Sequence, residues 1–285
     1  MDQRIINLFD EYTHKPLTRE EFLKKLAILT GSTAAALTVL PLLEVNYANA
    51  ATITPQDDRI TTEYINYNVD GIVMRGYLAR PKKKGKYPAV VVVHENRGLN
   101  PHTEDVARRF ASEGFIALAP DALSPLGGAP ADADKARELF QKLDASKNTQ
   151  NFVGAFDFLR DLKGCNGKFA CIGFCWGGAM ANTLAVNVPD LLAAAPFYGR
   201  QPDAADVPKI KAAIQLHYAE KDERVNAGIA AYEEALKKAN IPYEVHMYMG
   251  AQHAFFNDSA PTRYNEEAAK LAWSRVLTFF REKLQ

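Results

Sequence analysis

A cysteine flanked by glycines is the residue of this sequence best suited to covalent chemistry. The segment Gly173-Phe174-Cys175-Trp176-Gly177-Gly178 follows an apolar run and precedes a helical pattern, which matches a nucleophile elbow with cysteine in the serine position. Such a turn is strained and leaves room only for small residues two positions before and after the nucleophile. The helix N-terminus that follows favours a thiolate and a developing oxyanion. The pattern predicts Cys175 as the nucleophile and the Trp176 N–H as an oxyanion donor; a buried structural cysteine is the alternative.

A histidine and a carboxylate are expected later in the chain, because this elbow occurs in folds with the order nucleophile, acid, histidine. Of the three histidines after Cys175, only His253 comes just past an expected strand; the other two fall inside strands. Asp222 occupies the corresponding place after the preceding strand, and Glu220 in the same loop is the second candidate. We predict that Asp222 orients His253, which deprotonates the thiol or holds it as a thiolate.

The elements that must position these residues alternate between apolar runs and helical patterns. Residues 87–94 form a continuous β-branched run typical of a strand buried on both faces. This alternation predicts a single α/β domain over residues 51–285, with a mostly parallel sheet whose carboxyl ends carry the functional loops. Further strands are expected at 64–69, 72–80, 115–120, 168–174, 193–198, 212–217 and 243–248, and helices at 101–114, 132–143, 149–162, 179–186, 226–239 and 266–283.

The segment His94-Glu95-Asn96-Arg97-Gly98 ends the expected central strand, where the second oxyanion donor of this fold normally arises. Together with the elbow, the aspartate loop and the histidine loop, it resembles the dienelactone hydrolase family of α/β-hydrolases, over about residues 61–285. The resemblance implies that Glu95 holds the thiol in the resting enzyme and that the Asn96 N–H completes the oxyanion hole. It further implies hydrolysis of a small ester or lactone through a thioacyl enzyme, without a cofactor.

The residues that would choose the substrate depart from the family pattern. Dienelactone hydrolases hold a substrate carboxylate with arginines in two loops, but residues 121–125 and 253–257 contain none here. We therefore consider Arg97 as a replacement cation and Phe255 as part of an apolar pocket. A broader carboxylesterase or thioesterase with the same triad is the alternative.

The overall composition limits the class of protein. The chain has 285 residues, is 47% hydrophobic and carries 34 acidic and 34 basic side chains, so its net charge offers no attraction for nucleic acid or anionic lipid. Its cysteines, Cys165, Cys171 and Cys175, form no C-x-x-C pair and share their segment with no histidine, which argues against a metal site. A metal or redox protein, or a non-catalytic binding protein on the same fold, are the alternatives from other classes.

Residues 1–50 have the composition of an export signal. Arg19, Lys24 and Lys25 precede an uncharged run at 26–43, and small residues follow at 46–50. The basic part resembles a twin-arginine signal in which Glu20 replaces the second arginine. Export to the periplasm is therefore expected without stable membrane insertion; the alternatives are a membrane anchor and an appended helix on a cytoplasmic protein.

Overall fold

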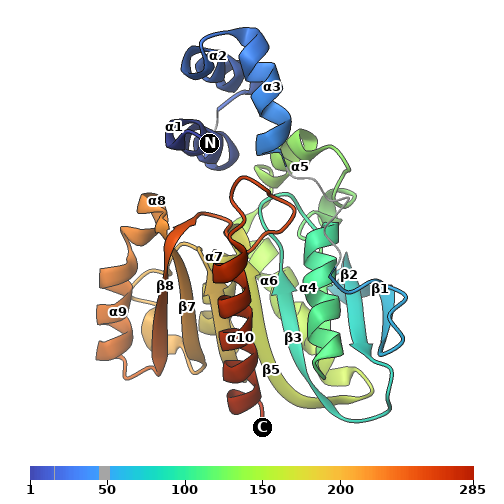
Figure 1. Ribbon diagram of the computed structural model, residues 1–285. Helices are drawn as coiled ribbons and strands as arrows, with labels where there is room; N and C mark the ends of the chain where they lie inside the picture. Colours follow the sequence, from blue (N-terminus) through green and yellow to red (C-terminus); the bar gives the residue numbers. More distant parts are fainter. Residues whose placement is uncertain (16, 45–51) are drawn as a thin grey trace.

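The computed structural model describes residues 1–15, 17–44 and 52–285. An α/β domain built on one sheet follows three N-terminal helices, which lie over the edge formed by the carboxyl ends of the parallel strands (Figure 1). This is the edge at which α/β sheets place their functional groups.

The sheet has eight strands in the order β1-β2-β4-β3-β5-β6-β7-β8. Strands β1, β2 and β4 pair antiparallel, and all pairings from β4 through β3 to β8 are parallel. The α/β-hydrolase architecture predicted from the sequence is therefore confirmed. The strands are β1 (Ile60–Val69), β2 (Ile72–Pro81), β3 (Tyr87–Val93), β4 (Ile116–Pro120), β5 (Cys165–Phe174), β6 (Leu191–Phe197), β7 (Ala213–Lys221) and β8 (Tyr243–Gln252).

Strand β5 differs from its expected bounds. It begins at Cys165, whereas the sequence suggested a turn at 166–167 and a strand from 168. The pairing of β5 with β3 shifts register between Tyr87 and Ala89, and Gly167 has a φ of 80°. A bulge of this kind lets the strand continue through residues that resemble a turn.

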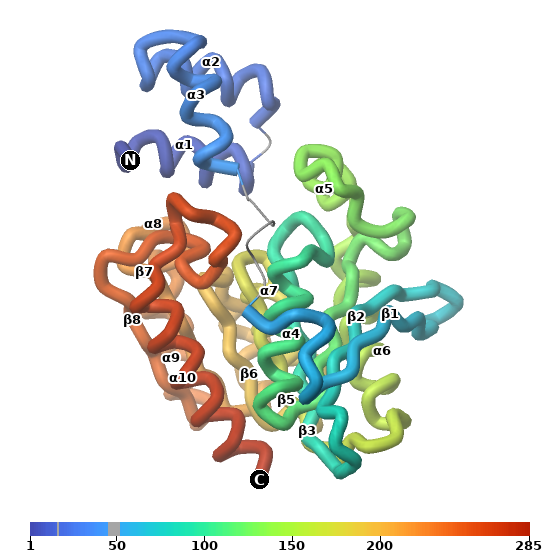
Figure 2. The backbone as a smooth tube through the Cα atoms, turned by 45° about the vertical axis from the view of Figure 1, so that its right-hand side comes forward, coloured from blue at the N-terminus to red at the C-terminus, as the bar shows by residue number. Residues whose placement is uncertain are grey.

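Helices cover both faces of the sheet (Figure 2). One face, which includes Val90 and Val92, packs against α4 (Pro101–Ser112) and α10 (Glu266–Lys283). The other face, which includes Val91 and Val93, packs against the remaining long helices. Their bounds are α6 (Ala145–Asp161), α7 (Trp176–Asn187) and α9 (Ile229–Lys238), and the shorter helices are α5 (Ala133–Phe140), α8 (Glu223–Asn226), η2 (Ser124–Leu126) and η3 (Val207–Lys209).

The three N-terminal helices, which we call the helical cap, have a small core of their own. They are α1 (Gln3–His14), α2 (Arg19–Thr30) and α3 (Thr33–Leu43). Thr18 and Glu21 form a capping box at the start of α2, which fixes its first turn. The apolar side chains that pack together in this core are Ile5, Leu8, Phe9, Tyr12, Phe22, Leu26, Ala36, Leu40 and Leu43.

The uncharged run at residues 26–43 is divided between two helices. Gly31, with a φ of 86°, ends α2, and Ser32 caps α3, so that the two helices meet at a bend of 110°. Within the described ranges, no single helix is long and apolar enough to cross a membrane, although this bent pair passes the length and composition test together. Residues 46–50, on which the expected cleavage site falls, lie outside the described residues. Export therefore stays a prediction.

Candidate active site

The turn between β5 and α7 has the strained geometry of a nucleophile elbow. Cys175 has a φ of 58° and a ψ of −113°, and its N–H donates to the carbonyl oxygen of Phe197 at 3.0 Å. A β-carbon on Gly173 would lie 1.9 Å from the carbonyl oxygen of Gly177, and one on Gly177 would lie 2.4 Å from that of Val93. Glycine is therefore required at both positions, because the backbones of β5, α7 and β3 approach one another closely here.

The predicted histidine and aspartate lie together beside this turn. Asp222 follows β7 directly, and His253 follows β8 directly. Nδ1 of His253 is 2.6 Å from a carboxylate oxygen of Asp222, and both side chains are buried. Nε2 of His253 is also buried, and no hydrogen-bond partner for it occurs in residues 1–15, 17–44 and 52–285. The ring is therefore oriented by the carboxylate with its second nitrogen available.

Glu220, the other carboxylate of this loop, has a different role. It is exposed, and its side chain accepts a hydrogen bond from the Gly250 N–H at 2.7 Å, which links the end of β7 to β8. The carboxylate that contacts His253 is that of Asp222.

In the described ranges, the backbone N–H groups of two residues, Trp176 and Asn96, are free to bind an oxyanion. Trp176 is the first residue of α7, so its N–H has no partner within the helix. The Asn96 side-chain amide donates to the carbonyl oxygen of Thr13 at 2.7 Å. In the part of the chain that the structure describes, neither the Trp176 nor the Asn96 backbone N–H donates a hydrogen bond.

Glu95 does not hold the thiol in this structure. One of its carboxylate oxygens accepts a hydrogen bond from the side-chain amide of Asn257 at 3.0 Å, and the other is buried and unpaired among the described residues. The atom that contacts the Cys175 sulfur is instead Nε2 of His14, at 3.0 Å. The resting partner that the family resemblance implied is thus replaced by a histidine of the cap.

His14 lies at the end of α1 between the sulfur and a carboxylate. Its Nδ1 is 2.8 Å from the carbonyl oxygen of Asp10 and 3.1 Å from the Asp10 carboxylate, and its ring contacts that of His253 edge to face at 4.8 Å. Burial lowers the pKa of His14, but the neighbouring Cys175 sulfur and Asp10 outweigh burial and raise it to about 9. Burial opposes the charge on Asp10 too, but its contact with His14 and the charges of His253 and Arg224 hold the Asp10 pKa far below its usual value.

Three atoms of kinds that can bind a metal ion lie close together, because the donor atoms of His14, Cys175 and His253 are all within 4.8 Å of one another. The His14 nitrogen and the sulfur are 3.0 Å apart, whereas a thiolate and an imidazole on one tetrahedral zinc ion would be about 3.6 Å apart. A separation of 3.0 Å is that of a hydrogen bond, so the arrangement suits the sharing of a proton.

A cavity of about 540 Å³ opens onto the Cys175 sulfur and is lined by both the sheet domain and the cap. Its lining includes four large apolar side chains, Phe140, Leu143, Trp176 and Met180, and three guanidinium groups, those of Arg137, Arg200 and Arg224. Arg97 and Phe255, the two substrate-binding residues suggested by the sequence, do not line it. Phe255 is fully buried against Phe197, Tyr198 and Tyr248, so it is a core residue.

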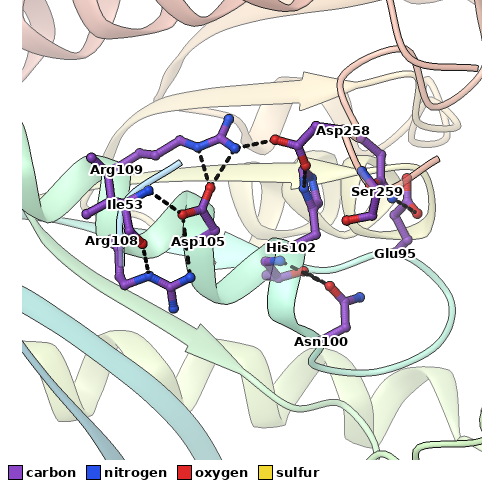
Figure 3. Close-up of polar contacts among 11 residues, drawn as sticks. Ile53, Glu95, Asn100, His102, Asp105, Arg108, Arg109, Asp258 and Ser259 are labelled. Atoms are coloured by element: carbon purple, nitrogen blue, oxygen red, sulfur yellow. Dashed lines mark hydrogen bonds and ion pairs between the residues drawn. The ribbon is translucent and has the colours of Figure 1, made fainter. Parts of the chain in front are cut away.

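A network of ion pairs and hydrogen bonds holds the loop that carries His253 (Figure 3). Asp258, on the His253 loop, contacts His102 of α4 at 2.8 Å and also pairs with Arg109. Arg109 in turn contacts Asp105, which is fully buried. The loop is therefore tied to a helix of the core, which restricts the position of the imidazole.

Sequence reasoning missed most of the cavity lining, including His14, Tyr198 and Arg200. Tyr198 has a buried hydroxyl without a partner in the described ranges, and burial, with the charges of Glu95 and Cys175, raises its pKa well above the usual value. The apolar spacing within residues 3–14 was the available signal for α1, because it indicates a packed amphipathic helix. No spacing in the sequence indicates which sheet edge that helix would cover.

Known proteins that are similar to this chain include members of one hydrolase family. A family model described as "Dienelactone hydrolase family" matches residues 74–284. A relative from Escherichia coli K12, "Putative hydrolase fragment YghX", is 58% identical over 38% of this chain and 96% of its own length. A "Putative carboxymethylenebutenolidase" of Saccharolobus solfataricus is 32% identical over 76% of this chain and 97% of its own. A crystal structure titled as a "Putative Dienelactone Hydrolase" from Klebsiella pneumoniae superposes with a TM-score of 0.71 and 29% identity, over 78% of this chain and 98% of that one.

Proposed function

The chain belongs to the dienelactone hydrolase family, and from this premise we propose that it cleaves a small ester or lactone through a cysteine nucleophile and a thioacyl intermediate. The observation that carries the proposal is the convergence of the Cys175 elbow with the His253–Asp222 pair. Cys175 lines the cavity, the imidazole of His253 is paired with the Asp222 carboxylate, and the same cavity is lined by Trp176 and Asn96, whose backbone N–H groups are unpaired in the described ranges.

In the first half of the reaction, the thiolate of Cys175 attacks the carbonyl carbon of the substrate and an S–C bond forms. The N–H groups of Trp176 and Asn96 stabilise the negative charge that develops on the carbonyl oxygen. The C–O bond to the leaving group then breaks, leaving the acyl group on sulfur. The leaving oxygen needs a proton, which must come from an acid beside the sulfur.

In the second half, His253 takes a proton from a water molecule, and the resulting hydroxide attacks the thioester carbonyl. The C–S bond breaks, the thiolate returns, and the carboxylic acid is released. Asp222 holds His253 in the tautomer that leaves Nε2 free to accept this proton.

The cavity indicates the kind of substrate. A volume of about 540 Å³ suits a small molecule. The apolar side chains of the lining, together with the Arg200 guanidinium, which has no ion pair in the described ranges, favour an apolar or cyclic acyl group that bears a negative charge. The broader alternative is a carboxylesterase or thioesterase with the same triad, which the same cavity would accommodate.

The proposal is tested by intact-mass spectrometry with lactones, linear esters and thioesters as substrates. The Cys175→Ala variant should lose the acyl adduct and nearly all turnover, and Cys175→Ser should retain an adduct that turns over slowly. Iodoacetamide should abolish turnover in the unmodified protein. Full activity of Cys175→Ala would overturn the proposal, and the substrate panel separates a lactone preference from a general esterase.

A further inference from the structure

The sulfur of Cys175 is approached by two histidines that come from opposite ends of the chain. His253 is carried by the sheet domain, and His14 is carried by the helical cap. Of these two histidines, His14 is the one that contacts the sulfur at hydrogen-bond distance, 3.0 Å from its Nε2. Nε2 of His253 has no partner in the described ranges, so the two imidazoles differ in what they can do in the resting protein.

His14 is itself paired with an acid. The Asp10 carboxylate is 3.1 Å from its Nδ1, and the Asp10 carbonyl oxygen at 2.8 Å accepts the Nδ1 hydrogen. With Nδ1 as a donor, Nε2 is the nitrogen that exchanges a proton with the sulfur. The Asp10–His14 pair therefore repeats, on a helix, the arrangement that Asp222 and His253 form on the sheet.

Specific contacts hold α1 in this position. The Arg137 guanidinium donates to the carbonyl oxygens of Tyr12 and Leu17, at 3.1 and 3.2 Å, and lies over the Tyr12 ring. The Tyr12 hydroxyl donates to Asp134 at 2.5 Å. On the other side of the cavity, the Asn96 side chain binds the Thr13 carbonyl oxygen. Because these contacts come from separate elements around the cavity, the place of His14 is determined by more than the packing of the cap itself.

We propose that His14, supported by Asp10, is a further catalytic residue, which holds Cys175 as a thiolate in the resting enzyme and then protonates the leaving group. The proposal rests on the proposed function and assigns the acid that the acylation step requires. The S–H proton moves to Nε2 of His14, giving an imidazolium and a thiolate. When the C–O bond of the substrate breaks, the same proton passes to the leaving oxygen.

The proton that His14 has lost is then restored from His253. Deacylation leaves a proton on His253, taken from water, and a neutral imidazole at His14. A nitrogen of each ring lies within 4.8 Å of one on the other, so one water molecule between them can return this proton to His14 and restore the resting pair. The net reaction consumes one water and releases one acid and one alcohol.

The test uses the full chain, with retention of residues 1–15 checked by intact mass, and compares His14→Gln, Asp10→Asn and the control His246→Gln. His246 is partly buried on β8 and pairs with Glu244, away from the cavity lining. The first readout is the rate at which iodoacetamide alkylates Cys175 at pH 6, which follows the thiolate fraction and needs no turnover. We expect His14→Gln to slow alkylation by about tenfold, Asp10→Asn to slow it less, and His246→Gln to leave it unchanged.

The second readout compares ethyl esters with p-nitrophenyl esters of the same acid. An alkoxide needs a proton to leave and p-nitrophenolate does not, so His14→Gln should reduce kcat/KM for the ethyl ester about tenfold more than for the p-nitrophenyl ester. Alkylation that is unchanged or faster in His14→Gln would overturn the proposal, because His14 would then be a spectator or a shield. An active Cys175→Ala variant would instead overturn the proposed function, so the two failures are distinguishable.

Discussion

Two histidine–carboxylate pairs face one sulfur, and they are built by different means. Asp222 and His253 follow the last two parallel strands and lie inside the region that the family model matches, residues 74–284. Asp10 and His14 occupy one helix that lies outside that region. The first pair is placed by the order of strands in the sheet, and the second by contacts between a helix and the rim of a cavity. A histidine–carboxylate pair can therefore be positioned by the order of the sheet strands or by a helix that packs against the sheet domain.

The two pairs also differ in how strongly each imidazole is already engaged. Asp222 contacts Nδ1 of His253 at 2.6 Å and leaves the other nitrogen free, whereas both nitrogens of His14 have partners. A free nitrogen suits a base that must accept a proton from water, and an engaged one suits an acid that already holds its proton. This difference predicts separate roles in the two halves of the reaction.

The largest effect is expected from removing the sheet-borne base. His253→Gln should lower kcat by about 10²–10⁴-fold, because the thioester then lacks a group to activate water. The acyl-enzyme should accumulate, visible as a full burst of p-nitrophenol and as an added mass on Cys175. His14→Gln should not accumulate it. Equal accumulation in both variants would contradict the division of roles.

The sheet-borne pair was predictable from the sequence, because strand order dictates it. The continuous apolar run at 87–94, the elbow glycines and the order cysteine, aspartate, histidine together determine which loops meet at the carboxyl edge of the sheet. Asp222 and His253 then follow from being the polar residues just past the last two strands. Local patterns suffice here because parallel strands carry their ends to a common edge.

The helix-borne pair was not predictable, because its position depends on tertiary docking. The composition of residues 19–50 also matches an export signal, so residues 1–50 were given no part in the active site. Glu95 shows the same limit: its place in the chain is as expected, but its carboxylate binds Asn257 and His14 contacts the sulfur. If export removes residues 1–50, the mature chain would lack His14, and the intact mass of protein recovered from the periplasm would show it.

A smaller effect is expected on the preference for negatively charged substrates, and it distinguishes Arg200 in the cavity lining from Arg97 in the loop after β3. Arg200 lines the cavity, is exposed and forms no ion pair within the described ranges, whereas Arg97 does not line the cavity. Arg200→Ala should therefore reduce kcat/KM for an anionic ester by about tenfold, the scale of one charge-assisted hydrogen bond, and leave a neutral ester unchanged. The matched control, Arg97→Ala, should leave the preference intact. The opposite pattern would restore Arg97 as the substrate cation.

Loosening the cap without touching His14 should have a more modest effect on activity. Arg137→Met removes the donors that hold the Tyr12 and Leu17 carbonyl oxygens but keeps much of the side-chain volume. Hydrogen exchange in α1 should quicken, and ethyl-ester kcat/KM should fall by a few-fold, about 1 kcal/mol or less for contacts of this kind. Lys135→Met, at an exposed position of the same helix, is the control. Faster exchange in α1 with unaltered ester kinetics would show that activity does not need the docked cap.

The smallest effect concerns how the Tm depends on pH, to which the Asp10–His14 pair contributes through the raised pKa of His14. The pKa of His14 is raised to about 9 in the folded protein, above the ordinary value of about 6.5, so protonated His14 stabilises the fold fully below pH 6.5 and this contribution is lost as pH rises through 9. Cys175 gives up its own proton when the pair forms, which offsets most of this dependence, so the Tm of the unmodified protein relative to His14→Gln should fall between pH 6.5 and 9.5 by only on the order of 2 °C. Cys175→Ala should reduce this dependence, because the sulfur is the largest of the influences that raise the pKa of His14. A Tm difference that rises across this range would contradict the raised pKa of His14.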